Sequence, residues 1–158
     1  AEHENYFNIG TVIQSYLRRS DGDLRALIDN GVPVRLVKGA YAEPPHIAYQ
    51  KKKDVDTAYR RQMWALLDEG VRPQIATHDE NMIHATKLFA KQKSIPPEKF
   101  EFQMLLGVRR DLQESLVKEG YKVRVYVPFG QSWYPYFTRR LAERPANFGF
   151  FLKSVVKK

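Results

Sequence analysis

The chain has 158 residues, with 26 lysines and arginines against 18 aspartates and glutamates, so its formal charge is +8. Hydrophobic residues make up 43% and charged residues 28%, which is enough apolar material for one packed domain and too little bias for a disordered chain. The absence of cysteine excludes disulfide scaffolds, cysteine-ligated zinc and thiol nucleophiles. No apolar run approaches the roughly 18 residues that a membrane-spanning helix needs.

The basic character of the chain has several interpretations. A pI near 9.7 is compatible with a nucleic acid, an anionic membrane surface or another anionic ligand, and equally with a solvated basic surface. The charge is spread along the chain, and only residues 50–54 (QKKKD) and 154–158 (SVVKK) form local clusters. Because no zinc-finger spacing and no RNA-binding motif appears, we expect no nucleic-acid partner.

Apolar, β-branched runs alternate along the chain with segments of helical periodicity. The first predicted strand lies in residues 8–17 (NIGTVIQSYL). A helix is expected to follow over residues 20–31, where Asp21 or Asp23 can act as the N-cap. The second predicted strand lies in residues 32–41 (VPVRLVKGAY).

The next helix is predicted to begin at Asp54 as its cap and to stop at Gly70. Its buried face should contain Val55, Ala58, Tyr59, Gln62, Met63, Leu66 and Leu67. Residues 71–78 form the third predicted strand, and Asp79 is a plausible cap for the helix after it. On that helix the residues expected to share the buried side are Met82, Ala85, Leu88 and Phe89.

Two further units complete the alternation. Residues 100–107 (FEFQMLLG) predict a fourth strand, and residues 109–119 predict a helix that ends at a glycine. Residues 121–130 (YKVRVYVPFG) predict a fifth strand. A last helix is expected between Pro135, in its first turn, and Pro145, which ends it.

Strand and helix repeated five times predict an α/β fold with parallel strands joined by crossover helices. Two architectures have this pattern: an open doubly wound sheet and part of a closed (β/α) barrel. A closed eight-stranded barrel needs roughly 200 residues or more. From periodicity and length alone, the open sheet is therefore favoured.

Several polar residues lie within or at the ends of the predicted strands, where parallel α/β proteins bind ligands. They are Gln14, Arg35, Lys38, Thr77, His78, Gln103 and Tyr126. Arg35 is the clearest case, because a cation within an apolar strand requires either an ion pair or a ligand. Lys38 precedes Gly39 and Ala40, which places a cation beside small residues that let a ligand come close to the backbone.

The sequence also contains a pair of arginines at helical spacing from a glutamate. Arg139 and Arg140 lie four and three residues before Glu143, so the carboxylate can reach either guanidinium on a helix. Two guanidiniums can hold a ligand carboxylate with bidentate geometry, and a surface cluster of ion pairs is the alternative. His78 has no second histidine at metal-binding spacing, so we expect no metal site.

Five blocks of the chain, taken in order, resemble the proline dehydrogenase family, most closely its monofunctional bacterial type. The blocks are RLVKGAY (35–41), ATHDE (76–80), FEFQMLLGVR (100–109), RVYVPFG (124–130) and YFTRRLAERPAN (136–147). The resemblance implies a distorted (β/α)8 TIM barrel that holds FAD. It also implies oxidation of L-proline to Δ1-pyrroline-5-carboxylate, the first step of proline catabolism to glutamate, with electrons passed to a quinone.

The resemblance further implies a role for each candidate site residue. Arg35 would be catalytic, as a fixed cation beside the flavin N5, where the hydride arrives. The cofactor-binding residues would be Gln14, Arg35, Lys38, Gly39, Ala40, Thr77, His78 and Gln103. The residues that bind or enclose proline would be Leu105, Tyr126, Tyr136, Arg139, Arg140 and Glu143, with the two arginines on its carboxylate.

The matching region begins near the fourth barrel strand, so we expect residues 1–158 to be the C-terminal portion of the FAD-binding barrel domain. A partial barrel of about five β/α units, from strand 4 to helix 8, would expose strand edges, so we also expect association through those edges or with the other half. The expected location is cytoplasmic, with peripheral contact at the inner membrane. The alternative is a non-catalytic basic α/β module, either a truncated remnant or a polyanion-binding domain.

Overall fold

The computed structural model describes residues 9–131, in which five parallel strands form one sheet. The strands are β1 (Thr11–Gln14), β2 (Val34–Val37), β3 (Gln74–Ala76), β4 (Glu101–Leu105) and β5 (Lys122–Tyr126). The helices are α1 (Ser20–Asp29), α2 (Lys52–Glu69), α3 (Glu80–Gln92) and α4 (Arg110–Lys118), with a 3₁₀ turn η1 (Pro97–Lys99) before β4. All five predicted strands and the four predicted helices that fall within residues 9–131 are confirmed.

The strands follow one another across the sheet in chain order, β1-β2-β3-β4-β5. A doubly wound sheet reverses its strand order at a switch point, and this one does not. Because parallel crossovers are right-handed, a sheet that always advances in one direction places all its helices on one face. The doubly wound open sheet favoured by periodicity is therefore wrong, and the arrangement is that of part of a barrel wall.

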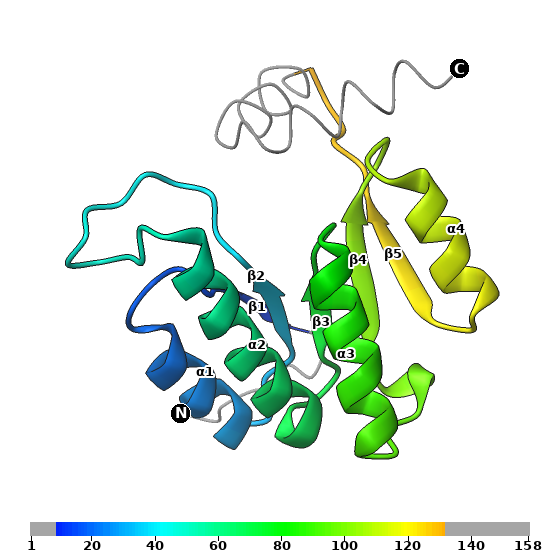
Figure 1. Ribbon diagram of the computed structural model, residues 1–158, viewed down its shortest axis with the longest axis horizontal. Helices are drawn as coiled ribbons and strands as arrows, with labels where there is room; N and C mark the ends of the chain where they lie inside the picture. Colours follow the sequence, from blue (N-terminus) through cyan, green and yellow to red (C-terminus); the bar gives the residue numbers. More distant parts are fainter. Residues whose placement is uncertain (1–8, 132–158) are drawn as a thin grey trace, which may run out of the picture.

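The core lies between the sheet and the helices. Figure 1 shows α1, α2 and α3 in front of the strands and α4 beside β5. The helix-facing residues of the strands include Ile13, Leu36, Ile75, Phe102 and Met104, all buried. They pack against apolar side chains of every helix, among them Leu24, Tyr59, Met82 and Leu116. The predicted buried face of α2 is confirmed, including Gln62, which is 2% exposed.

Two predicted helix starts are wrong. The N-cap of α1 is Arg19, and α2 begins at Lys52, two residues before the expected cap Asp54. Asp21 and Asp23 lie inside the first turn of α1, where their charge still favours the positive end of the helix dipole. Asp23 accepts a hydrogen bond from Arg19 Nε at 2.6 Å, so its carboxylate pairs with a side chain instead of capping the backbone.

The cap of α3 is confirmed, but its buried side is rotated from the predicted one. Asp79 accepts a hydrogen bond from the Asn81 backbone N–H at 3.0 Å. The buried residues are Met82, Ile83, Thr86 and Ala90, whereas Leu88 is 49% exposed. Thr86 can be buried because its hydroxyl donates to the Met82 carbonyl at 2.7 Å within the helix.

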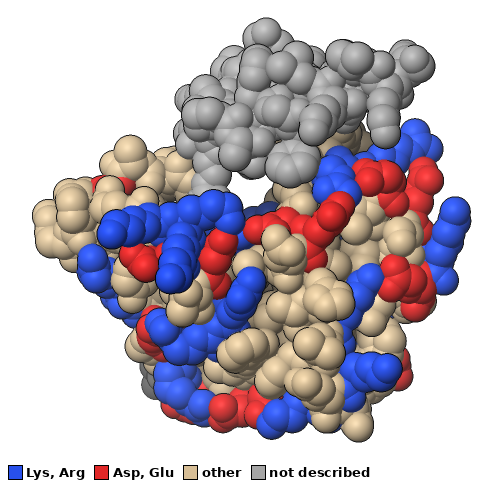
Figure 2. Space-filling view, in the orientation of Figure 1, with Lys and Arg blue, Asp and Glu red and all other residues tan. Residues whose placement is uncertain are grey.

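Cations and carboxylates are interspersed over the face seen in Figure 2. Several of the exposed cations pair with a nearby acid: Arg25 with Asp29 and Glu69, Arg61 with Asp21, Lys87 with Glu119, Lys93 with Asp68 and Arg110 with Glu114. Exposed pairs of this kind contribute little to stability, but they neutralise much of the local charge. The face seen in Figure 2 therefore carries charges of both signs, as expected of a surface in contact with solvent.

Candidate functional site

The face of the sheet opposite the helices carries mostly polar side chains. Successive residues of a strand point to opposite faces, so residues beside the core-facing ones lie here. The strand register aligns them in rows: Val12, Arg35, Gln74, Glu101 and Lys122 form one row, and Ala76, Gln103 and Arg124 lie in the next. We call this the polar face and define it by Gln14, Arg35, Gln74, Glu101, Gln103, Arg124 and Tyr126.

Arg35 extends across this face and contacts two strands that do not neighbour its own. Its Nε–H donates to the side-chain oxygen of Gln103, on β4, at 2.6 Å. Its guanidinium lies over the ring of Tyr126, on β5, with the central carbon 4.2 Å from the ring centroid. Strands three places apart in a flat sheet are separated by about 14 Å, so the contact requires both side chains to lean over the sheet.

No carboxylate pairs with Arg35 anywhere in residues 9–131. Its partners among those residues are the neutral amide of Gln103 and the aromatic face of Tyr126. Both terminal NH₂ groups therefore have no hydrogen-bond acceptor among those residues. Half-buried guanidiniums are normally paired, so this cation has donor capacity available for a ligand.

Gln103 is the centre of a hydrogen-bonded chain. It is 2% exposed, and its Nε2 donates to Glu101 Oε1 at 2.6 Å and to Gln74 Oε1 at 2.8 Å. Glu101 in turn accepts two hydrogen bonds from Arg124, at 2.6 and 2.9 Å. Burial alone would raise the pKa of Glu101, but the hydrogen bonds from Arg124 and Gln103 outweigh it and hold that pKa below its usual value.

His78 provides a second hydrogen-bond donor, in addition to Arg35, beside the hydrogen-bonded residues around Gln103. Its Nε2 accepts a hydrogen bond from the Leu105 backbone N–H at 2.9 Å, so the neutral ring carries its proton on Nδ1. Burial, together with the positive charges of Arg109 and Arg35, lowers the pKa of His78 to about 4. The imidazole is therefore neutral at pH 7. Within the described part of the chain, its Nδ1–H has no hydrogen-bond acceptor.

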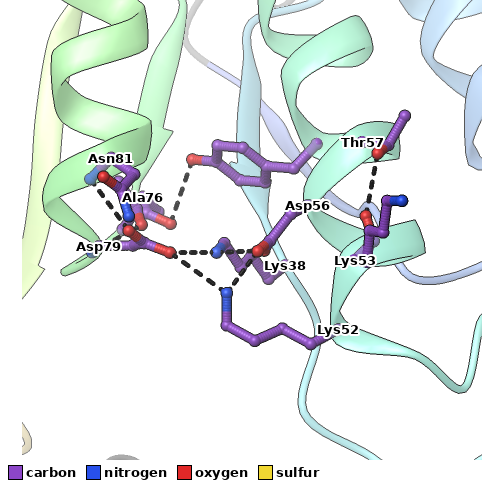
Figure 3. A network of polar contacts seen from close by, with 10 residues as sticks. Lys38, Lys52, Lys53, Asp56, Thr57, Ala76, Asp79 and Asn81 are labelled. Atoms are coloured by element: carbon purple, nitrogen blue, oxygen red, sulfur yellow. Dashed lines mark hydrogen bonds and ion pairs between the residues drawn. The ribbon is translucent and has the colours of Figure 1, made fainter.

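A separate network binds Lys38 at the carboxyl ends of β2 and β3 (Figure 3). Its ammonium donates to Asp56 Oδ1 at 2.5 Å and to Asp79 Oδ2 at 2.6 Å, and its side chain is 11% exposed. Lys52 also pairs with Asp56. Burial raises the pKa values of Asp56 and Asp79, but the contacts to Lys38 more than offset it, so both pKa values lie below the usual range.

Thr77 belongs to the same network through the start of α3. Its side chain is buried, and its Oγ1 accepts a hydrogen bond from the Asp79 backbone N–H at 3.1 Å. Tyr59, which is fully buried, reaches the carbonyl of Ala76 with its hydroxyl at 3.4 Å. The contacts of Thr77 and Tyr59 therefore both fix the backbone at the carboxyl end of β3.

Gly39 and Ala40 line a hollow of about 330 Å³ with Tyr16, Tyr41, Lys52 and Asp56. Gly39 has a φ of +95°, and a Cβ built on it would lie 2.1 Å from Cδ1 of Tyr16. A glycine is required here by the Tyr16 ring as well as by the backbone. Lys38 leads into this segment, so the two carboxylates that hold its ammonium also fix the hollow's edge.

The predicted site residues therefore divide into groups. Contacts join Arg35, Gln103 and Tyr126, and His78 joins them through Leu105. Lys38 and Thr77 meet at Asp79, and Gly39 and Ala40 form the adjoining hollow. Gln14 ends β1 beside Val37, at the far side of the polar face. Tyr136, Arg139, Arg140 and Glu143, with the helix expected there, lie outside the described residues.

Sequence reasoning missed the residues that hold these groups in place, namely Asp56, Asp79 as an ion-pair partner, Gln74, Glu101 and Arg124. One signal could have identified Glu101 and Arg124, because polar residues recur at every second position of β4 and β5. Asp56 carried no such signal, since it comes from a distant helix.

Residues 9–131 contain neither a cluster of metal ligands nor a membrane-spanning helix. They contain no group of three or more histidines, aspartates or glutamates that could hold a metal ion. None of their helices is both long enough and apolar enough to cross a bilayer.

Comparison with known proteins identifies the chain's relatives. The family model for proline dehydrogenase matches residues 1–153. The chain is 50% identical over 157 residues to proline dehydrogenase of Deinococcus radiodurans, covering 99% of this chain and 49% of that protein. It is 48% identical to proline dehydrogenase 2 of Bacillus subtilis strain 168, covering 98% of this chain and 51% of that protein.

A solved structure supports the same relationship as the sequence relatives. Proline utilization A from Bdellovibrio bacteriovorus, inactivated by N-propargylglycine, superposes with a TM-score of 0.80 at 36% identity, over 87% of this chain and 16% of that one. The chain spans about half the length of the curated relatives it matches. The family match over nearly all residues, the relatives and the sequential barrel-type sheet agree: this chain belongs to the proline dehydrogenase family.

Proposed function

We propose that this chain is the C-terminal portion, residues 1–158, of the catalytic barrel domain of a proline dehydrogenase. In this proposal it contributes one wall of a site in which L-proline is oxidised to Δ1-pyrroline-5-carboxylate with FAD as the cofactor. The family membership supports the reaction class, and the polar face supports the place at which it occurs.

The single observation that carries the proposal is the state of Arg35. A half-buried guanidinium without a carboxylate partner in residues 9–131 leaves a positive charge uncompensated, which costs stability unless a ligand supplies acceptors or negative charge. Lys38, the other cation predicted for this site, is already held by two carboxylates. Of these two cations, Arg35 is therefore the one with capacity for a ligand.

The residues present fit a flavin. Its ring system offers hydrogen-bond acceptors. The polar face offers the terminal N–H groups of Arg35 as donors, and His78, beyond the end of β3, offers its Nδ1–H. Ala76, the small residue between the strands of Arg35 and Gln103, leaves room above the sheet for a planar group. A bound flavin supplies the acceptor for the hydride that leaves C5 of proline.

The chain's own residues would orient the reactants and stabilise charge. Arg35, held in place before any ligand arrives, would stabilise negative charge that develops on the cofactor. Leu105 and Tyr126 would pack against the proline ring. Arg139 and Arg140, oriented by Glu143 and joined by Tyr136 at the pocket's edge, would hold the proline carboxylate.

The remaining predicted residues would position the cofactor along its length. Gly39 and Ala40 would admit it close to the backbone, while Gln14, Thr77 and Gln103 would contact it farther along. Lys38 would act mainly by fixing the β2 exit, because its ammonium is already paired. We include in the same proposal a quinone as electron acceptor and a cytoplasmic location with peripheral membrane contact.

The test uses the full chain, alone and co-expressed with the part of the Deinococcus relative that this chain does not match. We expect the complex to purify with bound FAD and to lose its visible flavin absorbance when proline is added. Arg35→Met should weaken FAD binding, whereas Arg139→Met should raise the proline requirement and leave FAD binding nearly unchanged. Association of the two halves without any FAD binding would overturn the proposal in favour of a non-catalytic module.

A further inference from the structure

The hydrogen bonds around Gln103 have only one consistent direction. Its Nε2 faces two acceptors, Glu101 Oε1 and Gln74 Oε1, while its Oε1 faces the Nε–H of Arg35. If the amide were reversed, its NH₂ would face the donor of Arg35 and its oxygen would face the carboxylate. Both contacts would then be repulsive. The carboxylate of Glu101 and the guanidinium of Arg35 therefore act together to orient this amide.

Glu101 is suited to this role because Arg124 holds its carboxylate. Arg124 donates to both oxygens, from Nε at 2.6 Å and from Nη2 at 2.9 Å, in the two-pronged geometry typical of arginine–carboxylate pairs. The Arg124 side chain is 63% exposed and that of Glu101 is 16% exposed. The pair thus connects the solvent edge of β5 to the buried amide, and the amide connects it to Arg35.

We infer that Glu101, clamped by Arg124, is a positioning residue that orients the Gln103 amide and through it holds the Arg35 guanidinium in place for a ligand. Glu101 is two residues from Gln103 on the same strand and makes no ion pair with Arg35. Its influence on Arg35 passes through one neutral amide. This inference rests on the proposed function for the nature of the ligand, but the positioning itself is a property of the chain alone.

The first arm of the test measures positioning without any ligand. In ¹⁵N NMR spectra of the full chain, the Arg35 Nε–H signal, assigned with Arg35→Lys, should exchange slowly with water. Glu101→Met removes the acceptor at nearly constant volume and should accelerate that exchange by about fivefold, the effect of losing one ordinary hydrogen bond. It should also shift both side-chain amide proton signals of Gln103.

Two variants make the result specific. Glu114→Met, which removes an exposed carboxylate paired with Arg110 on α4, should leave the Arg35 signal unchanged. Glu101→Gln keeps one acceptor for Gln103 without the charge and should give an intermediate exchange rate. Where Glu101→Met does not fold, Glu101→Gln decides in the same way. An Arg35 Nε–H signal that is the same in the Glu101 variants as in the unaltered chain would overturn the inference.

The second arm measures FAD binding by fluorescence quenching on the full chain joined to its partner half. Glu101→Met should raise the dissociation constant by about fivefold, with Glu114→Met unchanged. If the unaltered complex binds no FAD, the proposed function fails while the NMR arm still decides the inference. If FAD binds and Glu101→Met leaves the dissociation constant unchanged, the inference fails and the proposed function stands.

Discussion

Lys38 and Asp79 join the ends of two neighbouring strands, with the lysine Nζ donating to the aspartate Oδ2 across 2.6 Å. Asp56, from α2, accepts from the same ammonium, so three elements meet at one buried cation. Lys38→Met leaves two partly buried carboxylates close together. We expect a loss of roughly 2 kcal/mol in the free energy of unfolding, measured with urea, because part of the charge remains exposed to solvent. An unfolding curve that matches the unaltered chain would contradict the network.

Asp79 has two separable roles, as an ion-pair partner and as the cap of α3. Asp79→Asn removes the charge, but the asparagine side chain can still accept from the Asn81 backbone N–H. Asp79→Ala removes both contacts. We therefore expect Asp79→Ala to be less stable than Asp79→Asn by about 1 kcal/mol, the usual value of an N-cap. Equal unfolding free energies would show that the side chain does not cap the helix.

Gly39 should not tolerate a side chain. Its φ of +95° disfavours other residues, and a Cβ would lie 2.1 Å from the Tyr16 ring. The matched control is Gly120→Ala, where φ is +88° but no atom lies within 4 Å of the added Cβ. The control should cost about 1 kcal/mol from the backbone alone, and Gly39→Ala clearly more. Urea unfolding of both variants makes the comparison, and equal losses would contradict the contact with Tyr16.

His78 should make stability depend on pH over a defined window. In the unfolded chain the histidine takes up a proton near its ordinary pKa of 6.5, whereas the folded chain does so near 4. Between those values the unfolded state binds more protons, so the free energy of unfolding falls as the pH falls from about 6.5 to 4, by roughly 3 kcal/mol.

The measurement is the unfolding free energy of His78→Gln across that window. Glutamine can still accept a hydrogen bond from the Leu105 backbone N–H but does not titrate. The free energy of unfolding of this variant should therefore change less with pH than that of the unaltered chain. His84→Gln, at an exposed position of α3, should keep the original slope. Parallel curves for all three proteins would rule out a buried neutral imidazole at position 78.

Arg35 lies within β2 and Lys38 follows it directly, yet the loss of each cation should affect stability and FAD binding to different degrees. Arg35→Met removes one hydrogen bond and one aromatic contact and no ion pair within residues 9–131, so it should cost only about 1 kcal/mol. The Lys38→Met change should destabilise the fold more but weaken FAD binding less than Arg35→Met. Unfolding and FAD titrations of the two variants measure both effects, and the reverse ranking would contradict the assigned roles.

The elements were predictable because they depend on local rules. The β-branched runs, the Asp79 cap and the glycines at positions 70 and 120 marked strands and helices that the structure confirms. The errors in the predicted helix caps and buried faces arose where a side chain could make either of two contacts. Asp23 pairs with Arg19 instead of capping, and Leu88 is exposed because α3 turns Met82, Ile83 and Ala90 into the core cluster.

The sequence by itself determined that residues 9–131 form five strands alternating with helices and that their polar residues gather at strand ends, since period and turn chemistry are encoded in neighbouring residues. The resemblance of five ordered blocks also determined the family. Periodicity by itself favoured a doubly wound sheet and the resemblance implied a partial barrel, and the order in which the strands are added in the tertiary structure confirms the barrel wall. Only the tertiary structure separated Lys38, paired with acids from α2 and the β3 exit, from Arg35, whose partners are an amide and a tyrosine. Those partners lie 18 to 91 residues away along the chain, and such distances are closed by packing of the core and not by any local preference.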